Sequence, residues 1–264
     1  MSRINKLLTR IARRKGEREL ERISRLPRRE AGVTEHVQIE NQKIRFTDGA
    51  SFEEQYRQIF QRGIYDFDAD VDDPLMIDAG ANIGMGSLRF LQRFPRGRLI
   101  AFEPDPRIFS ILETNLREFD AGNVTLNNAA LWTDSDGVWF RGDEADAGRI
   151  GGDRHEETVF VRTEKLSTYL HQPVDFLKLD VEGAELPILL ESKGFLSSVR
   201  NLFVEYHSFI DQRQALDNVL SLLTEAGFRY NVESALRKQP HIYNPKIYDS
   251  MDGFVHIYAY RSTT

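Results

Sequence analysis

The stretch IDAGANIGMG, residues 77–86, decides the fold class of this 264-residue chain. It completes a short apolar run that is typical of a buried strand, and it leads into a helix predicted over 85–94. Its pattern D-x-G-x-x-x-G, at Asp78, Gly80 and Gly84, lets the chain turn sharply and lets a ligand lie close to the backbone. A strand, a glycine-rich turn and a helix in this order predict a doubly wound α/β sheet.

Strands and helices continue to alternate after this stretch. We expect helices over 106–119, from about 183, and over 211–226. Such a sheet is covered by helices on both faces and binds ligands at the carboxyl ends of its strands. The candidate binding residues are therefore those that end strands. The strands are expected at 75–78, 98–103, 124–128, 174–180, 201–207, 228–233 and 253–260.

Two smaller regions precede this core of 74–264. Residues 36–73 are expected to form a hairpin over 36–47 and a helix over 51–62, in which Ser51 and Glu54 make a capping box. Together with the core, this segment gives a main domain over 36–264.

Residues 1–35 form a basic extension with a helix predicted over 3–25. Its apolar stripe is short, which favours partial packing against the main domain over contact with an anionic membrane surface or an acidic partner. The rest of the chain is acidic, since the net charge is -6. The basic extension and the acidic body therefore differ in the partners that they suit.

The composition excludes several kinds of chemistry. The chain has no cysteine, so it has no disulfide, no thiolate zinc site and no iron–sulfur cluster. We find no signal peptide and no apolar run long enough to span a membrane. The expected location is cytoplasmic, with peripheral membrane contact as the alternative.

The ends of the first two strands favour S-adenosylmethionine over a dinucleotide. The fingerprint G-x-G-x-x-G is absent, and the carboxylate of Asp78 would repel a pyrophosphate. The sulfonium and ammonium groups of S-adenosylmethionine are positive, so acidic neighbours suit them. Glu103, in FEPDP, ends the second strand and can accept hydrogen bonds from both ribose hydroxyls.

Three further positions are candidates for contact with the cofactor. Asn128 ends the third strand and could bond the adenine edge, while the small Ala129 leaves room for the ring. A polar cap on the following turn explains Asn128 equally well. Tyr65 could cover the cofactor, although packing between the amino-terminal segment and the sheet also explains it.

The fourth strand ends in an unusual concentration of acid. In LKLDVEGAE, the carboxylates of Asp180, Glu182 and Glu185 fall within six residues and would be costly without a cation among them. The sulfonium, Lys178 and a divalent metal are the candidates for that cation. The dipole of the following helix explains Glu185 without any ligand, but it does not explain Asp180 on the strand.

The fifth strand ends in VEYH, where Glu205 and His207 point to the same face. His207 could remove a proton from an attacking hydroxyl, and Glu205 could orient it. A purely structural role for His207 is the alternative. The other histidines, His256 among them, are interpreted as surface or packing residues.

These motifs, in this order, resemble those of the FkbM family of S-adenosylmethionine-dependent methyltransferases. The resemblance rests on IDAGANIG, FEPDP, VDFLKLDVEGAE and VEYH, and it covers roughly residues 44–260. It implies a class I methyltransferase fold, Rossmann-like, with seven strands of which the last is antiparallel. It also implies O-methylation of a hydroxyl on a sugar, glycan or secondary metabolite.

By position, the resemblance assigns cofactor binding to Asp78, Gly80, Asn82, Gly84 and Glu103. It places Asp180, Glu182 and His207 at the reacting end. Related sugar methyltransferases sometimes use Mg²⁺, which makes Asp180 the candidate metal ligand.

Three other functions stay open on the sequence alone. An NAD-dependent oxidoreductase would need the missing dinucleotide fingerprint. A nucleic-acid methyltransferase would have to overcome repulsion between phosphates and the acidic body, so we expect no nucleic-acid partner. An inactive binding module on the same fold would not need the run of strand-end acids.

Overall fold

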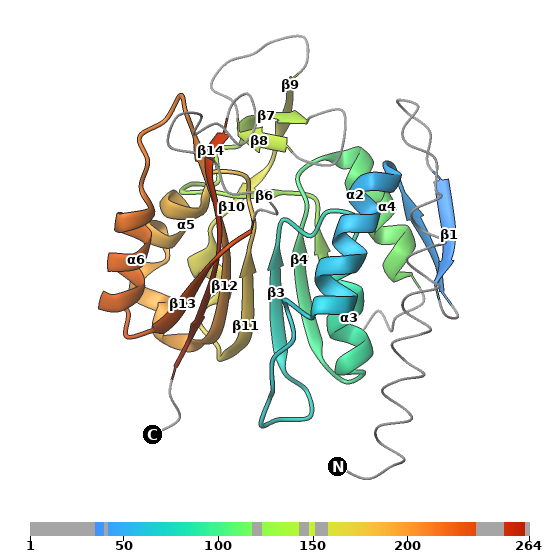
Figure 1. The fold of residues 1–264 in the computed structure, drawn as a ribbon, viewed down its shortest axis with the longest axis horizontal. Helices are drawn as coiled ribbons and strands as arrows, with labels where there is room; N and C mark the ends of the chain where they lie inside the picture. The colour runs from blue at the N-terminus through green and yellow to red at the C-terminus, as the bar shows by residue number, and fades with distance from the viewer. Residues whose placement is uncertain are drawn as a thin grey trace.

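A seven-stranded sheet forms the middle layer of the protein in a computed structural model (Figure 1). The structure describes residues 35–39, 42–117, 123–142, 148–150, 158–235 and 251–261. The strand order is β13-β14-β12-β11-β3-β4-β5, and only the pairs that β14 makes are antiparallel. The strands are β3 (Leu75–Ala79), β4 (Arg98–Phe102), β5 (Val124–Asn127), β11 (Val174–Leu179), β12 (Val199–Phe209), β13 (Arg229–Ser234) and β14 (Met251–Tyr260).

The two central strands, β3 and β11, mark the point where the strand order reverses. β4 and β5 follow on one side of β3, whereas β12, β14 and β13 follow on the far side of β11. All five residues of β3, LMIDA, are buried. An apolar strand without alternation is typical of a parallel sheet covered on both faces. A ligand crevice is expected at the carboxyl ends of these two strands, because the connections leave in opposite directions there.

Helices cover both faces of the sheet, and each face has its own apolar core (Figure 1). Phe176 and Phe203 of the sheet belong to the first core, and Leu177 and Val204, one residue further along their strands, belong to the second. The first face carries α2 (Gly49–Gln55), the π-helix η1 (Tyr56–Arg62), α3 (Met85–Arg93) and α4 (Pro106–Leu116). The second face carries η2 (Leu166–Tyr169), α5 (Glu185–Glu191), η3 (Lys193–Ser198) and α6 (Leu216–Glu225).

Three small sheets complete the described chain. The most important is a three-stranded sheet of order β8-β7-β9, which lies above one end of the main sheet (Figure 1). The bounds of the small strands are β1 (Glu35–Ile39), β2 (Gln42–Phe46), β6 (Ala130–Leu131), β7 (Val138–Gly142), β8 (Gly148–Ile150), β9 (Thr158–Val161) and β10 (Thr163–Glu164). β1 pairs with β2, and β6 pairs with β10.

The doubly wound sheet, its seven strands and its single antiparallel strand confirm the predicted fold class. The hairpin expected over 36–47 is present as β1 and β2. Among the described residues no helix is both long and apolar enough to cross a membrane. The helical extension predicted within residues 1–35 lies outside the described residues, apart from Glu35 in β1.

Two helix starts differ from the prediction. Asp48, not Ser51, caps α2: its Oδ1 accepts a hydrogen bond of 2.7 Å from the backbone N–H of Ser51. The capping box of Ser51 and Glu54 is therefore wrong, because the helix begins two residues earlier and places Ser51 inside its first turn. The helix expected from residue 211 begins at Leu216 instead.

Candidate active site

A cleft opens at the carboxyl ends of the central strands. It encloses about 750 Å³, part of which is open to solvent. Its polar wall includes Gly80, Asn82, Glu103, Asp180 and Glu182. Its apolar wall comes from Phe102, Ala129, Ala130, Leu131, Phe140 and Ile150. Phe140 and Ile150 belong to the small sheet of β7 and β8, which thus closes the cleft from above.

The turn after β3 passes unusually close to the end of β11. Gly80 has φ +78°, and a Cβ placed on it would lie 1.8 Å from the backbone oxygen of Asp180. Only glycine fits both the left-handed conformation and the close approach. Asn82 also has positive φ, +52°, and its side-chain oxygen accepts a hydrogen bond of 2.5 Å from the N–H of Ile83. The turn therefore presents backbone to the cleft, which suits a ligand that lies against it.

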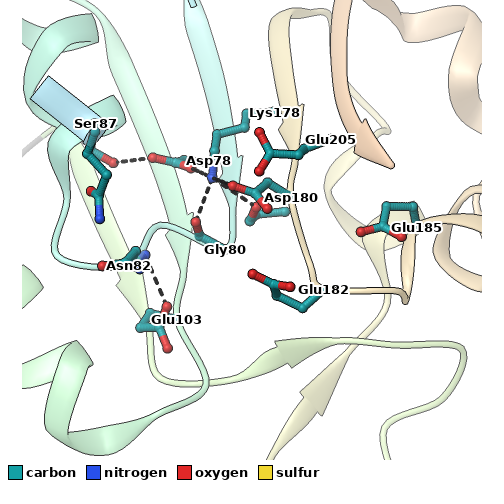
Figure 2. A network of polar contacts seen from close by, with 12 residues as sticks. Asp78, Gly80, Asn82, Ser87, Glu103, Lys178, Asp180, Glu182, Glu185 and Glu205 are labelled. Carbon is teal, nitrogen blue, oxygen red and sulfur yellow. Dashed lines mark hydrogen bonds and ion pairs between the residues drawn. The ribbon is translucent and has the colours of Figure 1, made fainter. Parts of the chain in front are cut away.

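Glu103 follows β4 and faces the same turn. Its carboxylate accepts a hydrogen bond of 3.0 Å from the backbone N–H of Asn82 (Figure 2). It accepts a second bond, of 2.8 Å, from the backbone N–H of Asp105. The side chain is buried, and burial raises its pKa to about 8 against the opposing effect of these two bonds. A carboxylate with its position fixed and with lone pairs to spare is suited to accept bonds from ribose hydroxyls.

A buried lysine lies beneath the turn. Lys178 of β11 donates a hydrogen bond of 2.6 Å to the carbonyl of Gly80, and its Nζ lies 3.3 Å from carboxylate oxygens of both Asp78 and Asp180 (Figure 2). The other oxygen of Asp78 accepts a 2.7 Å bond from Ser87. Burial lowers the pKa of Lys178, but the two carboxylates outweigh it and raise the pKa above its usual range. Lys178 is therefore a permanent cation.

The loop after β11 carries the acidic residues to the end of the cleft. Asp180 and Glu182 line the cleft directly. Glu182 has φ +52° and is followed by Gly183 at φ +98°, so two successive left-handed residues turn the chain sharply into α5. Burial raises the pKa of Glu182 above its usual range. The nearby His207 lowers this pKa, but repulsion from Asp180 and Glu205 raises it further.

His207, at the end of β12, lies among these carboxylates. Its Nδ1 lies 3.0 Å from Oε1 of Glu185, and its Nε2 lies 3.5 Å from Glu182 and 3.7 Å from Glu205. The side chains of His207 and Glu185 are almost completely buried. Burial lowers the pKa of His207, but Glu182 and Glu185 outweigh it and raise the pKa well above its ordinary value. The imidazole is thus a group that can hold a proton at the reacting end.

A second histidine completes the group. His256 of β14 is buried, and its Nε2 lies 2.8 Å from Oε2 of Glu205 on the neighbouring antiparallel strand. Because His256 is buried, the interpretation as a surface residue is wrong. It is also more than a packing residue, because the pairing of β12 with β14 places it opposite Glu205, to which it is hydrogen-bonded. Asp180, Glu205 and His207 each offer one ligand atom within 4.8 Å of one another, as a metal site would require.

The remaining candidates lie at the edge of the cleft or beneath it. The amide of Asn128 donates hydrogen bonds of 2.9 and 3.1 Å to the carbonyls of Glu103 and Pro104, so it fixes the loop that carries Glu103. Tyr65 is buried against Phe203, and Lys178 lies 5.7 Å from the centre of its ring. Gly84, at φ +92°, caps α3. These positions are described by the structure, whereas their roles in cofactor binding stay predictions.

Sequence reasoning missed three features of this site. Glu185 was explained by the helix dipole, yet its carboxylate bonds both the N–H of Gly183 and the ring of His207. Ser87 carried no signal beyond its place in the first turns of α3. Phe140 and Ile150 lie in an irregular region whose short strands gave no indication of which residues face the cleft.

Known proteins resemble this chain in sequence. A family described as the methyltransferase FkbM domain matches residues 78–230, which is more than half of the chain. The chain is 30% identical over 216 residues to methyltransferase sdnD of Sordaria araneosa, covering 66% of this chain and 80% of that protein. It is 26% identical over 156 residues to the 2-O-methyltransferase NoeI of Sinorhizobium fredii, covering 51% of this chain and 63% of that protein.

A solved structure agrees as well. The crystal structure of methyltransferase FkbM from Methylobacillus flagellatus superposes with a TM-score of 0.52 at 16% identity, over 78% of this chain and 48% of that one. At that identity the likeness shows the fold alone. The family match and the curated relatives carry the assignment further: this chain belongs to the FkbM family and is an S-adenosylmethionine-dependent methyltransferase.

Proposed function

We propose that the enzyme methylates a hydroxyl group of a sugar, glycan or other small polyhydroxylated acceptor, and that His207 accepts the proton. The observation that carries this proposal is the position of His207, buried beside Glu182 at the end of the cleft that Gly80 and Glu103 line. An alcohol needs a proton acceptor as it attacks, and a positioned histidine can provide one. One relative is named as a 2-O-methyltransferase, which agrees with oxygen as the acceptor atom.

Residues that line the cleft and residues beside it have different parts in this reaction. Glu103 and the backbone of Gly80 and Asn82 hold the nucleoside end of the cofactor. When bound, S-adenosylmethionine would supply the methyl group to the acceptor oxygen, and its sulfur would keep the electron pair of the broken carbon–sulfur bond. His207 takes the hydroxyl proton on Nε2, while Glu185 holds the ring through Nδ1. Most of the rate gain comes from this alignment.

A bound divalent cation is the second candidate for the group that activates the acceptor hydroxyl, since Asp180, Glu205 and His207 could together hold one. The contacts already present favour a reaction without it. Lys178 is ion-paired with Asp180, and His256 is hydrogen-bonded to Glu205, so both carboxylates have cationic or donor partners. Mg²⁺ also prefers oxygen ligands to imidazole. We therefore propose that His207, rather than a metal-bound hydroxide, accepts the proton of the acceptor hydroxyl.

The acceptor itself is expected to be a small molecule or a glycan rather than nucleic acid. Two carboxylates, those of Asp180 and Glu182, line this end of the cleft. They would repel a phosphate backbone. For the basic residues 1–35, partial packing against the main domain stays the favoured role, with contact to an anionic membrane surface or an acidic partner as the alternative.

The test is transfer of an isotope-labelled methyl group from S-adenosylmethionine to a panel of acceptors. The panel pairs each sugar with its deoxy analogue at one hydroxyl and includes a matched amine and an RNA duplex. Label on the hydroxylated sugars, lost with one particular deoxy analogue, supports the proposal and identifies the methylated position. Label on the amine or the RNA alone would overturn it.

A further inference from the structure

Lys178 joins the two strands that form the floor of the cleft. It stands on β11 directly opposite Asp78 of β3, its register partner. Its ammonium contacts the end of β3 through Asp78, the following turn through the carbonyl of Gly80, and the end of β11 through Asp180 (Figure 2). Tyr65 lies beside the ammonium, with its ring centre 5.7 Å away. The cation is therefore fixed in place beneath the turn that follows β3.

The charges of Lys178, Asp78 and Asp180 do not cancel. Asp78 is completely buried, and Asp180 is partly buried and lines the cleft. One ammonium between two carboxylates leaves one negative charge uncompensated. Without Lys178, these two carboxylates would face the same space with no cation of the protein between them, so the excess of negative charge would be larger by one.

We propose that Lys178 is a positioning residue that limits how strongly the cleft prefers the positively charged cofactor to its neutral product. S-adenosylmethionine carries a sulfonium charge that S-adenosylhomocysteine lacks, and the two differ otherwise only by the methyl group. A site with a larger excess of negative charge would bind the charged cofactor more tightly without stabilising the transition state, in which the sulfonium charge is being lost. Lys178 reduces that excess while it holds the carbonyl of Gly80 in position.

The test is calorimetric titration of S-adenosylmethionine and S-adenosylhomocysteine into the wild type and Lys178→Met. The variant removes the charge and keeps most of the apolar stem. We expect the ratio of the two dissociation constants to move at least about fivefold in favour of S-adenosylmethionine, because one compensating charge close to the site is lost. If both affinities fall by the same factor, Lys178 is only structural and the proposal is wrong. Lys193→Met, at an exposed lysine paired with Glu225, is the matched control and should leave the ratio unchanged.

If Lys178→Met fails to fold, Lys178→Gln replaces it in the same titration, and a double variant then checks that the shift comes from charge. Lys178→Met combined with Asp78→Asn removes one cation and one anion, so the group returns to a single negative charge on Asp180. The amide that Asp78→Asn introduces could still accept the hydrogen bond from Ser87. The ratio of affinities should return to within about twofold of the wild type. A double variant that folds and still shows the shifted ratio contradicts the proposal. The proposal is also contradicted if the double variant shifts the ratio and the single variant does not.

Discussion

The Nδ1 atom of His207 lies 3.0 Å from the carboxylate of Glu185, which is itself hydrogen-bonded to the N–H of Gly183 at the start of α5. This contact fixes the orientation of the ring and leaves Nε2 as the nitrogen that faces Glu182 and Glu205. A buried carboxylate that orients a histidine in this way also stabilises its protonated form. The pair therefore controls both the position and the proton affinity of the imidazole.

Replacement of His207 by Ala should reduce kcat by about 100- to 10,000-fold, the usual contribution of a positioned proton acceptor. The affinity for S-adenosylhomocysteine should change by less than about threefold, because His207 does not line the part of the cleft that Gly80 and Glu103 form. Steady-state kinetics and calorimetry measure the two effects separately. Unchanged turnover would remove His207 from the mechanism.

The rate should rise with pH through the pKa of His207 and then level off. Its pKa is raised, so this rise should come at higher pH than for an ordinary histidine, because the imidazole must lose its proton before it can accept another. Replacement of Glu185 by Gln removes a charge that raises this pKa, so the ascending limb of the kcat profile should move to lower pH. Glu113→Gln, on the exposed surface of α4, is the matched control. An identical limb in wild type and Glu185→Gln would contradict the pairing.

Replacement of Gly80 by Ala should abolish cofactor binding and destabilise the protein by about 1–3 kcal/mol, through its left-handed φ and its clash with Asp180. Gly194→Ala serves as the control, since a Cβ there would have no neighbour within 4 Å. Thermal unfolding and calorimetry report the two effects. Normal cofactor affinity in Gly80→Ala would show that the turn does not contact the cofactor.

Removal of divalent metals should leave the rate unchanged within about twofold. The reason is that Asp180 and Glu205 already have Lys178 and His256 as partners. The measurement is methyl transfer after treatment with a chelator, with and without added Mg²⁺ or Mn²⁺. Activity that disappears with the chelator and returns with one metal would instead make Asp180, Glu205 and His207 its ligands.

Much of the cleft could be predicted because its residues end parallel strands. Asp78, Glu103 and Asp180 are each recognisable as an acid at the end of a buried strand, and the topology brings those ends together. Gly80 and Gly84 are likewise recognisable from the pattern D-x-G-x-x-x-G, and both have positive φ in the structure. Here a local pattern and a general rule of the fold are sufficient.

The rest depends on contacts that no local pattern records. The bond between His256 and Glu205 joins residues 51 apart and requires the register of the antiparallel pair of β12 and β14. Asn128 is polar at a strand end, as a cofactor ligand would be, but its amide is engaged by two backbone carbonyls. Ser51 and Glu54 have the sequence of a capping box, yet Asp48 is also a good cap and starts the helix earlier.

The measurement that tests the account most directly is calorimetric titration of S-adenosylhomocysteine into the wild type and Glu103→Ala between pH 7 and pH 9. Burial raises the pKa of Glu103 to about 8, and ribose hydroxyls bond its ionised form best. Affinity should therefore rise about tenfold over this range as the carboxylate loses its proton. Glu103→Ala should bind at least about tenfold more weakly at pH 9 and lose this pH dependence. Equal affinity and equal pH dependence in the two proteins would contradict the placement of the cofactor in this cleft.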